Sequence, residues 1–115
     1  MIMKLNDEPF ELMASGKKII EVRCADPKRR ELKIGDEAVF VKISDPEKII
    51  RTEVADLRFF PTFLELYSAY PSSMFGYEDK TAEELAASVD GIYEKEKQEK
   101  YGALAITVKV KGTEI

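Results

Sequence analysis

Two lysines, a glutamate and an arginine lie within the short stretch from Gly16 to Arg23, where a helical pattern gives way to an apolar strand pattern. The charged residues are Lys17, Lys18, Glu21 and Arg23. A guanidinium presents a fork of N–H donors to a phosphate or carboxylate, and a neighbouring carboxylate accepts a hydrogen bond from a base or sugar. These side-chain types therefore predict a site for an anionic or base-bearing ligand.

Strand alternation decides which of these side chains share a site. In a regular strand Glu21 and Arg23 point to the same face, about 7 Å apart, and Lys18 points to the opposite face with Ile20 and Val22. Lys18 joins Glu21 only if it precedes the regular strand or lies at a β-bulge. The competing interpretation is an ion-pair ladder on a solvated face, worth about 0.5 kcal/mol for each pair.

The composition excludes several classes of catalytic site. The 115 residues contain no histidine, which rules out Ser-His-Asp and Cys-His nucleophilic systems and the usual zinc-water sites. Any catalysis must therefore use lysine, carboxylate, hydroxyl or tyrosine groups, and we expect no metal and no cofactor. No apolar run approaches the roughly 20 residues of a membrane span, so no membrane partner is expected. A single cysteine, Cys24, forms no internal disulfide, which favours a cytoplasmic location.

Charge is distributed unevenly along the chain. The net charge is −4, which argues against a protein that coats nucleic acid without specificity. Residues 17–33 nevertheless contain seven basic and three acidic residues, a net +4, whereas residues 78–100 carry a net −4. A local basic face on an acidic protein suits a defined anionic ligand better than a long polyanion.

The elements that position the charged stretch follow from periodicity and turn signals. We expect strands over residues 2–5, 18–24, 38–43, 49–59 and 103–110, with a bend near residues 55–56. We expect a short helix between Asp7 and Gly16, and further helices from residue 62, over residues 81–89 and over residues 92–100. This order predicts a single α+β domain, residues 1–115, with a mixed, mostly antiparallel sheet. Strands of this number and length can close into a small barrel with helices across its openings.

Three stretches resemble the ASCH family of the PUA-like superfamily. The run Ser15-Gly16-Lys17-Lys18-Ile19-Ile20-Glu21-Val22-Arg23 resembles the family's glycine-x-lysine-x-x-glutamate-x-arginine signature. Ile34-Gly35-Asp36 resembles its hydrophobic-x-glycine-aspartate turn, and Lys100-Tyr101-Gly102-Ala103 resembles its tyrosine-glycine step into the final strand. The stretches occur in the family's order, and the likeness extends over nearly the whole chain.

The resemblance implies a fold and a ligand. The fold is a small PUA-like β-barrel with flanking helices and a cleft beside the helix that precedes the signature. The implied function is RNA or nucleotide binding in a cleft lined by Lys18, Glu21 and Arg23, with Lys17 at its edge. Tyr101 is a further candidate, which either donates a hydrogen bond to the ligand or packs at the entrance of the last strand.

A hydrolase is the alternative function. Some proteins that resemble this chain deacylate acetylated cytidine with a lysine, a threonine and a glutamate. Lys18 matches that lysine, but Glu21 stands at the threonine position, so the nucleophile of that mechanism is missing. An amidohydrolase-like or RNA-cleaving enzyme would have to use Lys18 and Glu21 as its acid/base pair, which requires burial or nearby cations to depress the pKa of Lys18.

Aromatic residues in the segment after residue 66 are candidates for stacking on a base. They are Tyr67, Tyr70, Phe75 and Tyr77, which surround Pro71 in an irregular loop. Single-stranded nucleic acid is often bound by such stacking. The competing interpretation is that these side chains belong to the core beside a helix.

Overall fold

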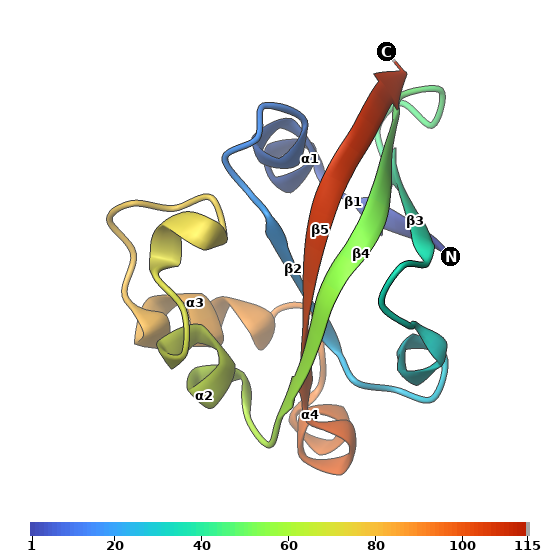
Figure 1. Ribbon diagram of the computed structural model, residues 1–115. Coiled ribbons are helices and arrows are strands. Elements are labelled where there is room, and N and C mark those ends of the chain that lie inside the picture. The colour runs from blue at the N-terminus through green and yellow to red at the C-terminus, as the bar shows by residue number, and fades with distance from the viewer. Residues whose placement is uncertain (115) are drawn as a thin grey trace.

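The computed structural model describes residues 1–114 and contains one five-stranded sheet and four α-helices (Figure 1). The strands are β1 (Ile2–Leu5), β2 (Ile20–Cys24), β3 (Glu37–Lys42), β4 (Ile49–Phe60) and β5 (Ala103–Glu114). The helices are α1 (Asp7–Ala14), α2 (Phe63–Ser68), α3 (Ala82–Val89) and α4 (Lys95–Tyr101). Short 3-10 turns occupy Arg29–Glu31 and Ser72–Met74.

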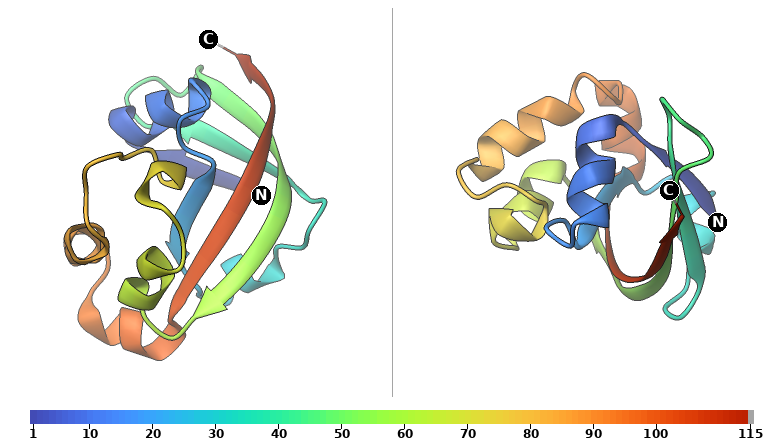
Figure 2. Two further views of the ribbon diagram at one scale, coloured as in Figure 1. Left: turned by 60° about the vertical axis from the view of Figure 1, so that its left-hand side comes forward. Right: turned by 90° about the horizontal axis from the view of Figure 1, so that it is seen from above.

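The sheet is mixed and mostly antiparallel, which confirms the predicted α+β class. Its strand order is β1-β3-β4-β5-β2, and only β1 and β3 run parallel among the described strands. Figure 2 shows that the sheet curves strongly, with α1 beside one end and α2 and α3 on one side of β2. β1 and β2 nevertheless remain the two edges in residues 1–114, so the sheet is not closed and the predicted barrel is not confirmed.

The sheet is buried on both faces over part of its area. Along β5, Leu104 and Ile106 face one core, which includes Phe10 and Met13 of α1. Ala103 and Ala105, which point the other way, belong to a second core that α2, α3 and β2 complete. The candidate site lies along β2, between these two cores.

The long strands β4 and β5 bend together. Their register shifts between Val54 and Asp56, where the sequence predicts a bend, and again between Arg51 and Thr52. An unpaired residue at such a shift increases the local twist of a strand, which helps a long pair of strands to curve around the first core.

The connection from α4 into β5 requires glycine at position 102. Gly102 has a φ of +74°, which a side chain rarely tolerates. A Cβ atom at this position would lie 2.6 Å from the carbonyl oxygen of Phe60, too close for any real contact. The tyrosine-glycine step seen in the sequence therefore lets β5 begin directly against the end of β4.

Candidate functional site

The chain turns sharply between α1 and β2, and this turn places the first lysines of the charged stretch. The backbone N–H groups of Lys17 and Lys18 both donate to the carbonyl of Leu12, at 2.9 and 3.0 Å. Gly16 takes a φ of +83° in the turn, a conformation that glycine adopts without the steric cost of a Cβ atom.

Lys18 precedes the regular part of β2. It forms an isolated bridge with Phe75, and continuous pairing with β5 begins only at Ile20. The strand is therefore two residues shorter at its start than the pattern of residues 18–24 predicts. As a consequence Lys18 is free of the strand alternation, and its side chain lies beside Glu21 instead of on the opposite face.

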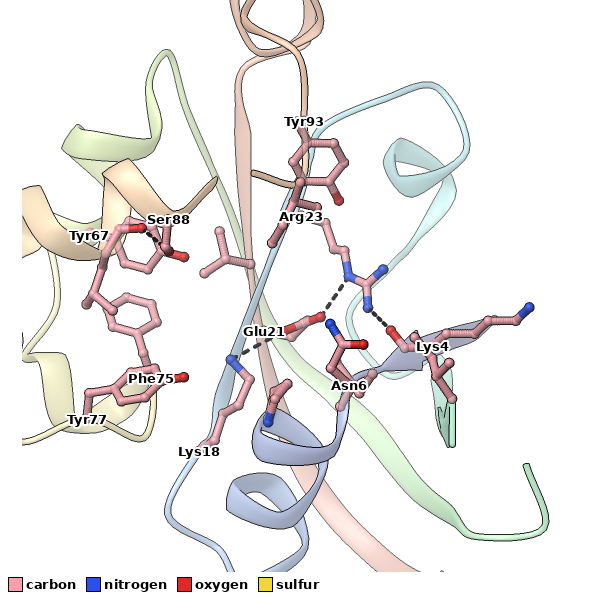
Figure 3. A pocket seen from close by; sticks show the side chains of 16 residues that line it. Lys4, Asn6, Lys18, Glu21, Arg23, Tyr67, Phe75, Tyr77, Ser88 and Tyr93 are labelled. Atoms are coloured by element: carbon pink, nitrogen blue, oxygen red, sulfur yellow. Dashed lines mark hydrogen bonds and ion pairs between the residues drawn. The ribbon is translucent and has the colours of Figure 1, made fainter. Parts of the chain in front are cut away.

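The side chains of Lys18, Glu21 and Arg23 form one buried network, which we call the charged triad (Figure 3). Lys18 Nζ lies 3.3 Å from Glu21 Oε1 and donates to the carbonyl of Ile20 at 2.9 Å. Arg23 Nε donates to Glu21 Oε2 at 2.7 Å, and Arg23 Nη2 donates to the carbonyl of Lys4 at 2.7 Å. Because Lys4 belongs to β1, the Arg23 guanidinium connects the two edge strands of the sheet.

Glu21 is ionised in this environment. Its exposed fraction is 6%, and that of Lys18 is 7%. Burial raises the pKa of Glu21, but the charges of Lys18 and Arg23 and the hydrogen bonds from both side chains outweigh burial and hold the pKa below its usual value. The carboxylate therefore acts as a hydrogen-bond acceptor between two cationic donors.

The charged triad forms one wall of a cavity of about 400 Å³, which lies within the range typical of small-molecule sites. Facing the triad in Figure 3 are aromatic side chains from the α2 and α3 side of the molecule. On that side lie Tyr67, Phe75 and Tyr77, whereas Tyr93, which also lines the cavity, lies beside Arg23 in Figure 3. A polar, charged wall opposite an aromatic wall suits a flat ligand that has hydrogen-bonding groups along one edge.

Two of these tyrosines keep their protons over a wide pH range. Burial raises the pKa of Tyr67, and the negative charge of Glu21 raises it further. Burial and a hydrogen bond to Glu8 raise the pKa of Tyr77 to about 12. The Tyr77 hydroxyl donates to Glu8 Oε1 at 2.7 Å, which joins the aromatic segment to α1 across the edge of the cavity.

The structure separates the remaining predicted residues from the cavity. Lys17 is exposed and does not line it, and neither does Tyr101, which packs against the second core beside Lys100. The carbonyl of Tyr101 accepts a hydrogen bond from Arg30, so this residue supports the entrance of β5. Tyr70 also lies outside the cavity and packs edge-to-face on Phe60 and Phe75.

Several cavity residues carry no signal in the sequence. Lys4, Asn6, Ser88, Ile92 and Tyr93 line the cavity, yet they come from β1, from the residue before α1, from α3 and from the loop after it. Their types and spacings are those of ordinary surface residues. Only the fold brings them to the charged triad.

A second cavity, of about 440 Å³, lies between the start of α2 and α4. Thr62 and Phe63 line one side of it, and Gln98 lines the other. Its charged lining residues, Asp90, Lys95 and Glu99, are exposed, so it has no counterpart of the buried triad.

The described residues offer neither a metal site nor a membrane-spanning helix. Residues 1–114 contain no group of three or more His, Cys, Asp or Glu side chains placed to hold a metal ion. None of the helices in this range has both the length and the apolar character needed to cross a membrane.

The family model of the ASCH domain matches residues 3–111, nearly the whole chain. The chain belongs to the ASCH family. All three stretches that resemble the family lie within the matched residues, and the signature forms the turn after α1 and the charged triad of β2. No curated protein matches this ASCH-domain chain.

Solved structures share the fold of this ASCH-domain protein. The crystal structure of hypothetical protein PH0355 superposes with a TM-score of 0.77 at 27% identity, covering 96% of this chain and 99% of that one. The solution structure of protein PF0455 from Pyrococcus furiosus gives a TM-score of 0.70 at 28% identity, covering 96% and 98%. The crystal structure of ASCH from Zymomonas mobilis superposes with a TM-score of 0.58 at 13% identity, covering 94% of this chain and 65% of that one. This likeness supports the fold alone.

Proposed function

We propose that this ASCH-domain protein binds RNA or a nucleotide in the cavity lined by the charged triad. The observation that carries the proposal is the buried network of Lys18, Glu21 and Arg23 opposite an aromatic wall. Buried charges cost desolvation energy, and replacing a buried ion network by apolar side chains is often neutral or stabilising. A network that contributes little to stability yet lines a cavity is well suited to a ligand.

The cavity contains the groups that nucleotide binding needs. Arg23 and Lys4 supply positive charge on the polar side of a cavity whose other side is aromatic. Tyr67, Phe75 and Tyr77 supply ring faces and edges, and bases in single-stranded RNA commonly stack on such side chains. The overall charge of −4 limits contacts with a long backbone, so the ligand is a nucleotide or a short segment of RNA.

Hydrolysis of a modified nucleoside or of RNA is the second candidate function. The 3.3 Å contact between Lys18 Nζ and Glu21 Oε1 favours it, because an acid/base pair must lie within such reach. The lowered pKa of Glu21 opposes it, since a carboxylate that stays ionised is a poor proton donor near neutral pH. Binding therefore accounts for the geometry better than catalysis does.

Calorimetric titration with nucleosides, nucleotides and short single-stranded RNA tests the proposal, with product analysis of the same mixtures for turnover. We expect saturable binding that weakens about tenfold or more in Arg23→Ala and Lys18→Met, because each variant removes charged hydrogen bonds. Arg51→Ala is the matched control, since Arg51 forms exposed ion pairs on β4, away from the cavity. Unchanged affinity in both site variants, or no binding by any probe, would overturn the proposal.

A further inference from the structure

The charged triad presents its hydrogen-bonding groups to the cavity in a fixed order, and this order restricts which ligands can pair with them. Figure 3 shows Glu21 between Lys18 and Arg23, with the carboxylate bonded to a cation on each side. An incoming ligand therefore meets a donor, an acceptor and a second donor in sequence. We propose that the cavity recognises the imide edge of a uracil-type base, in which an N–H lies between two carbonyls. This inference rests on the proposed nucleotide-binding function.

The unused hydrogen-bonding capacity of the triad supports this order. A lysine ammonium has three N–H donors, and Lys18 uses two of them on Ile20 and Glu21. A guanidinium has five, and Arg23 uses one on Glu21 and one on Lys4. Each Glu21 oxygen accepts one bond from a cation and keeps a further lone pair. Donors thus remain on both flanks, and an acceptor remains between them.

The imide edge of uracil complements these groups. Its two carbonyls would accept from Lys18 and from Arg23, and its N3–H would donate to the Glu21 carboxylate. The edge of cytosine has an amino donor in place of one carbonyl and an acceptor in place of the N–H. Cytosine would therefore set a donor against a cation and a lone pair against Glu21, and unpaired buried polar groups are strongly penalised.

The charge of the triad argues against a phosphate or carboxylate as the group bound at its centre. Lys18 and Arg23 are both already neutralised in part by Glu21, which lies between them. Any anion that reached both cations would place its own oxygens against the Glu21 carboxylate. A neutral imide has no such conflict, because its central group is a donor.

The aromatic wall supports a flat ring in this orientation. Tyr67 and Phe75 pack edge-to-face, with ring centroids 4.8 Å apart, and both line the cavity. A pyrimidine that presents its imide edge to the triad would place the rest of its ring toward this wall. The Tyr67 hydroxyl has no protein hydrogen-bond partner among residues 1–114, so it remains available for a ring substituent.

Titration calorimetry with the unmodified protein and matched ligands tests the inference. The probes are the 5′-monophosphates of uridine, cytidine and 3-methyluridine, together with hexamers of uridylate and cytidylate. We expect the uridine probes to bind at least about tenfold more tightly than the cytidine probes. The 3-methyl compound keeps both carbonyls but lacks the N3–H, and we expect it to bind about tenfold more weakly than its parent.

The outcomes separate this inference from the proposed function. Equal or tighter binding of the cytidine probes, or of 3-methyluridine monophosphate relative to its parent, would overturn the imide inference and leave nucleotide binding intact. No binding by any nucleotide or RNA probe would overturn both.

A variant at Glu21 adds a second measurement. In Glu21→Gln the central acceptor becomes an amide that also offers N–H donors, so we expect the ratio of uridine to cytidine affinity to fall toward one. Glu53→Gln is the matched control, because Glu53 forms an exposed ion pair with Lys111, and its ratio should equal that of the wild type. Melting curves of both variants establish that they are folded, and an undiminished ratio in folded Glu21→Gln would contradict the inference.

Discussion

Glu21 is the residue on which the electrostatics of the site depend. It is the only carboxylate in contact with Lys18 or Arg23 among the described residues, and both cations are themselves largely buried. Removing one partner of a buried ion network leaves the others uncompensated, which costs more than the network contributes as a whole. The site is therefore sensitive to single substitutions even though its net contribution to stability is small.

Glu21→Gln should lower the free energy of unfolding at pH 7 by about 3 kcal/mol. The pKa of Glu21 is lower in the folded protein than its value of 4.5 in a free chain, so the ionised carboxylate stabilises the fold above pH 4.5. This contribution is lost as the pH falls through the folded pKa. Urea denaturation from pH 7 to pH 3 should therefore show the difference between wild type and variant shrinking below about pH 4.5. A difference that grows on acidification would contradict this assignment.

At the scale of elements, the site depends on how the turn after α1 meets the segment around Phe75. Gly76 has a φ of +97°, and a Cβ atom there would lie 3.0 Å from Leu12 Cδ1 and 3.3 Å from Lys18 Cβ. The glycine thus lets the aromatic segment pack directly against α1 and the start of β2. This packing holds Lys18 at the position where it meets Glu21.

Gly76→Ala should destabilise the protein by about 1–3 kcal/mol through backbone strain, and it should also weaken ligand binding because Lys18 is displaced. Gly112→Ala is the control, since a Cβ atom at Gly112 meets nothing within 4 Å and its φ is not positive. The melting temperature of Gly76→Ala should lie clearly below that of the wild type, whereas the melting temperature of Gly112→Ala should stay close to it. Equal melting temperatures would show that the close approach at Gly76 carries no strain.

Local patterns predicted most of these elements. The last strand, the bend of β4 and the helix that begins after Thr81 each arise from residues close in sequence, and each is present in the structure. Whether the Lys18 side chain lies beside Glu21 depends on where β2 begins. Strict alternation predicts that Lys18 points to the face opposite Glu21, and this prediction is wrong because regular pairing begins only at Ile20. Its placement depends on the bridge to Phe75, a contact between residues 57 positions apart that no local pattern records.

The cavity itself was only partly predictable for the same reason. The signature identified the triad, and the aromatic segment supplied Tyr67, Phe75 and Tyr77 as stacking candidates. Tyr93 and Lys4 come from distant parts of the chain and carry no motif. Tyr101 lies next to a recognisable glycine step, but Gly102 ends α4 and directs the tyrosine toward the second core.

For the whole molecule, a net charge of −4 combined with a few cations at one cavity limits the electrostatic contribution to binding. Glu21 offsets one of the three cations Lys4, Lys18 and Arg23, so the cavity can neutralise at most about two phosphates. The logarithm of the affinity for a uridylate decamer should therefore fall with the logarithm of salt concentration with a slope no steeper than about −2. Fluorescence anisotropy between low and moderate salt measures this slope. A slope of about −4 or steeper would indicate an extended RNA-binding surface rather than the cavity.

The location of the ligand is the central claim, and a nuclear magnetic resonance titration of the labelled protein with uridine 5′-monophosphate tests it most directly. We predict saturable shifts in the backbone amides of residues 18–23 and of residues 67 and 75–77, which surround the cavity. The residues of the second cavity, near Thr62 and Gln98, provide an internal comparison, and the chemical shifts of their backbone amides should stay unchanged. Shifts confined to that region, or no shift at any nucleotide concentration, would contradict the account.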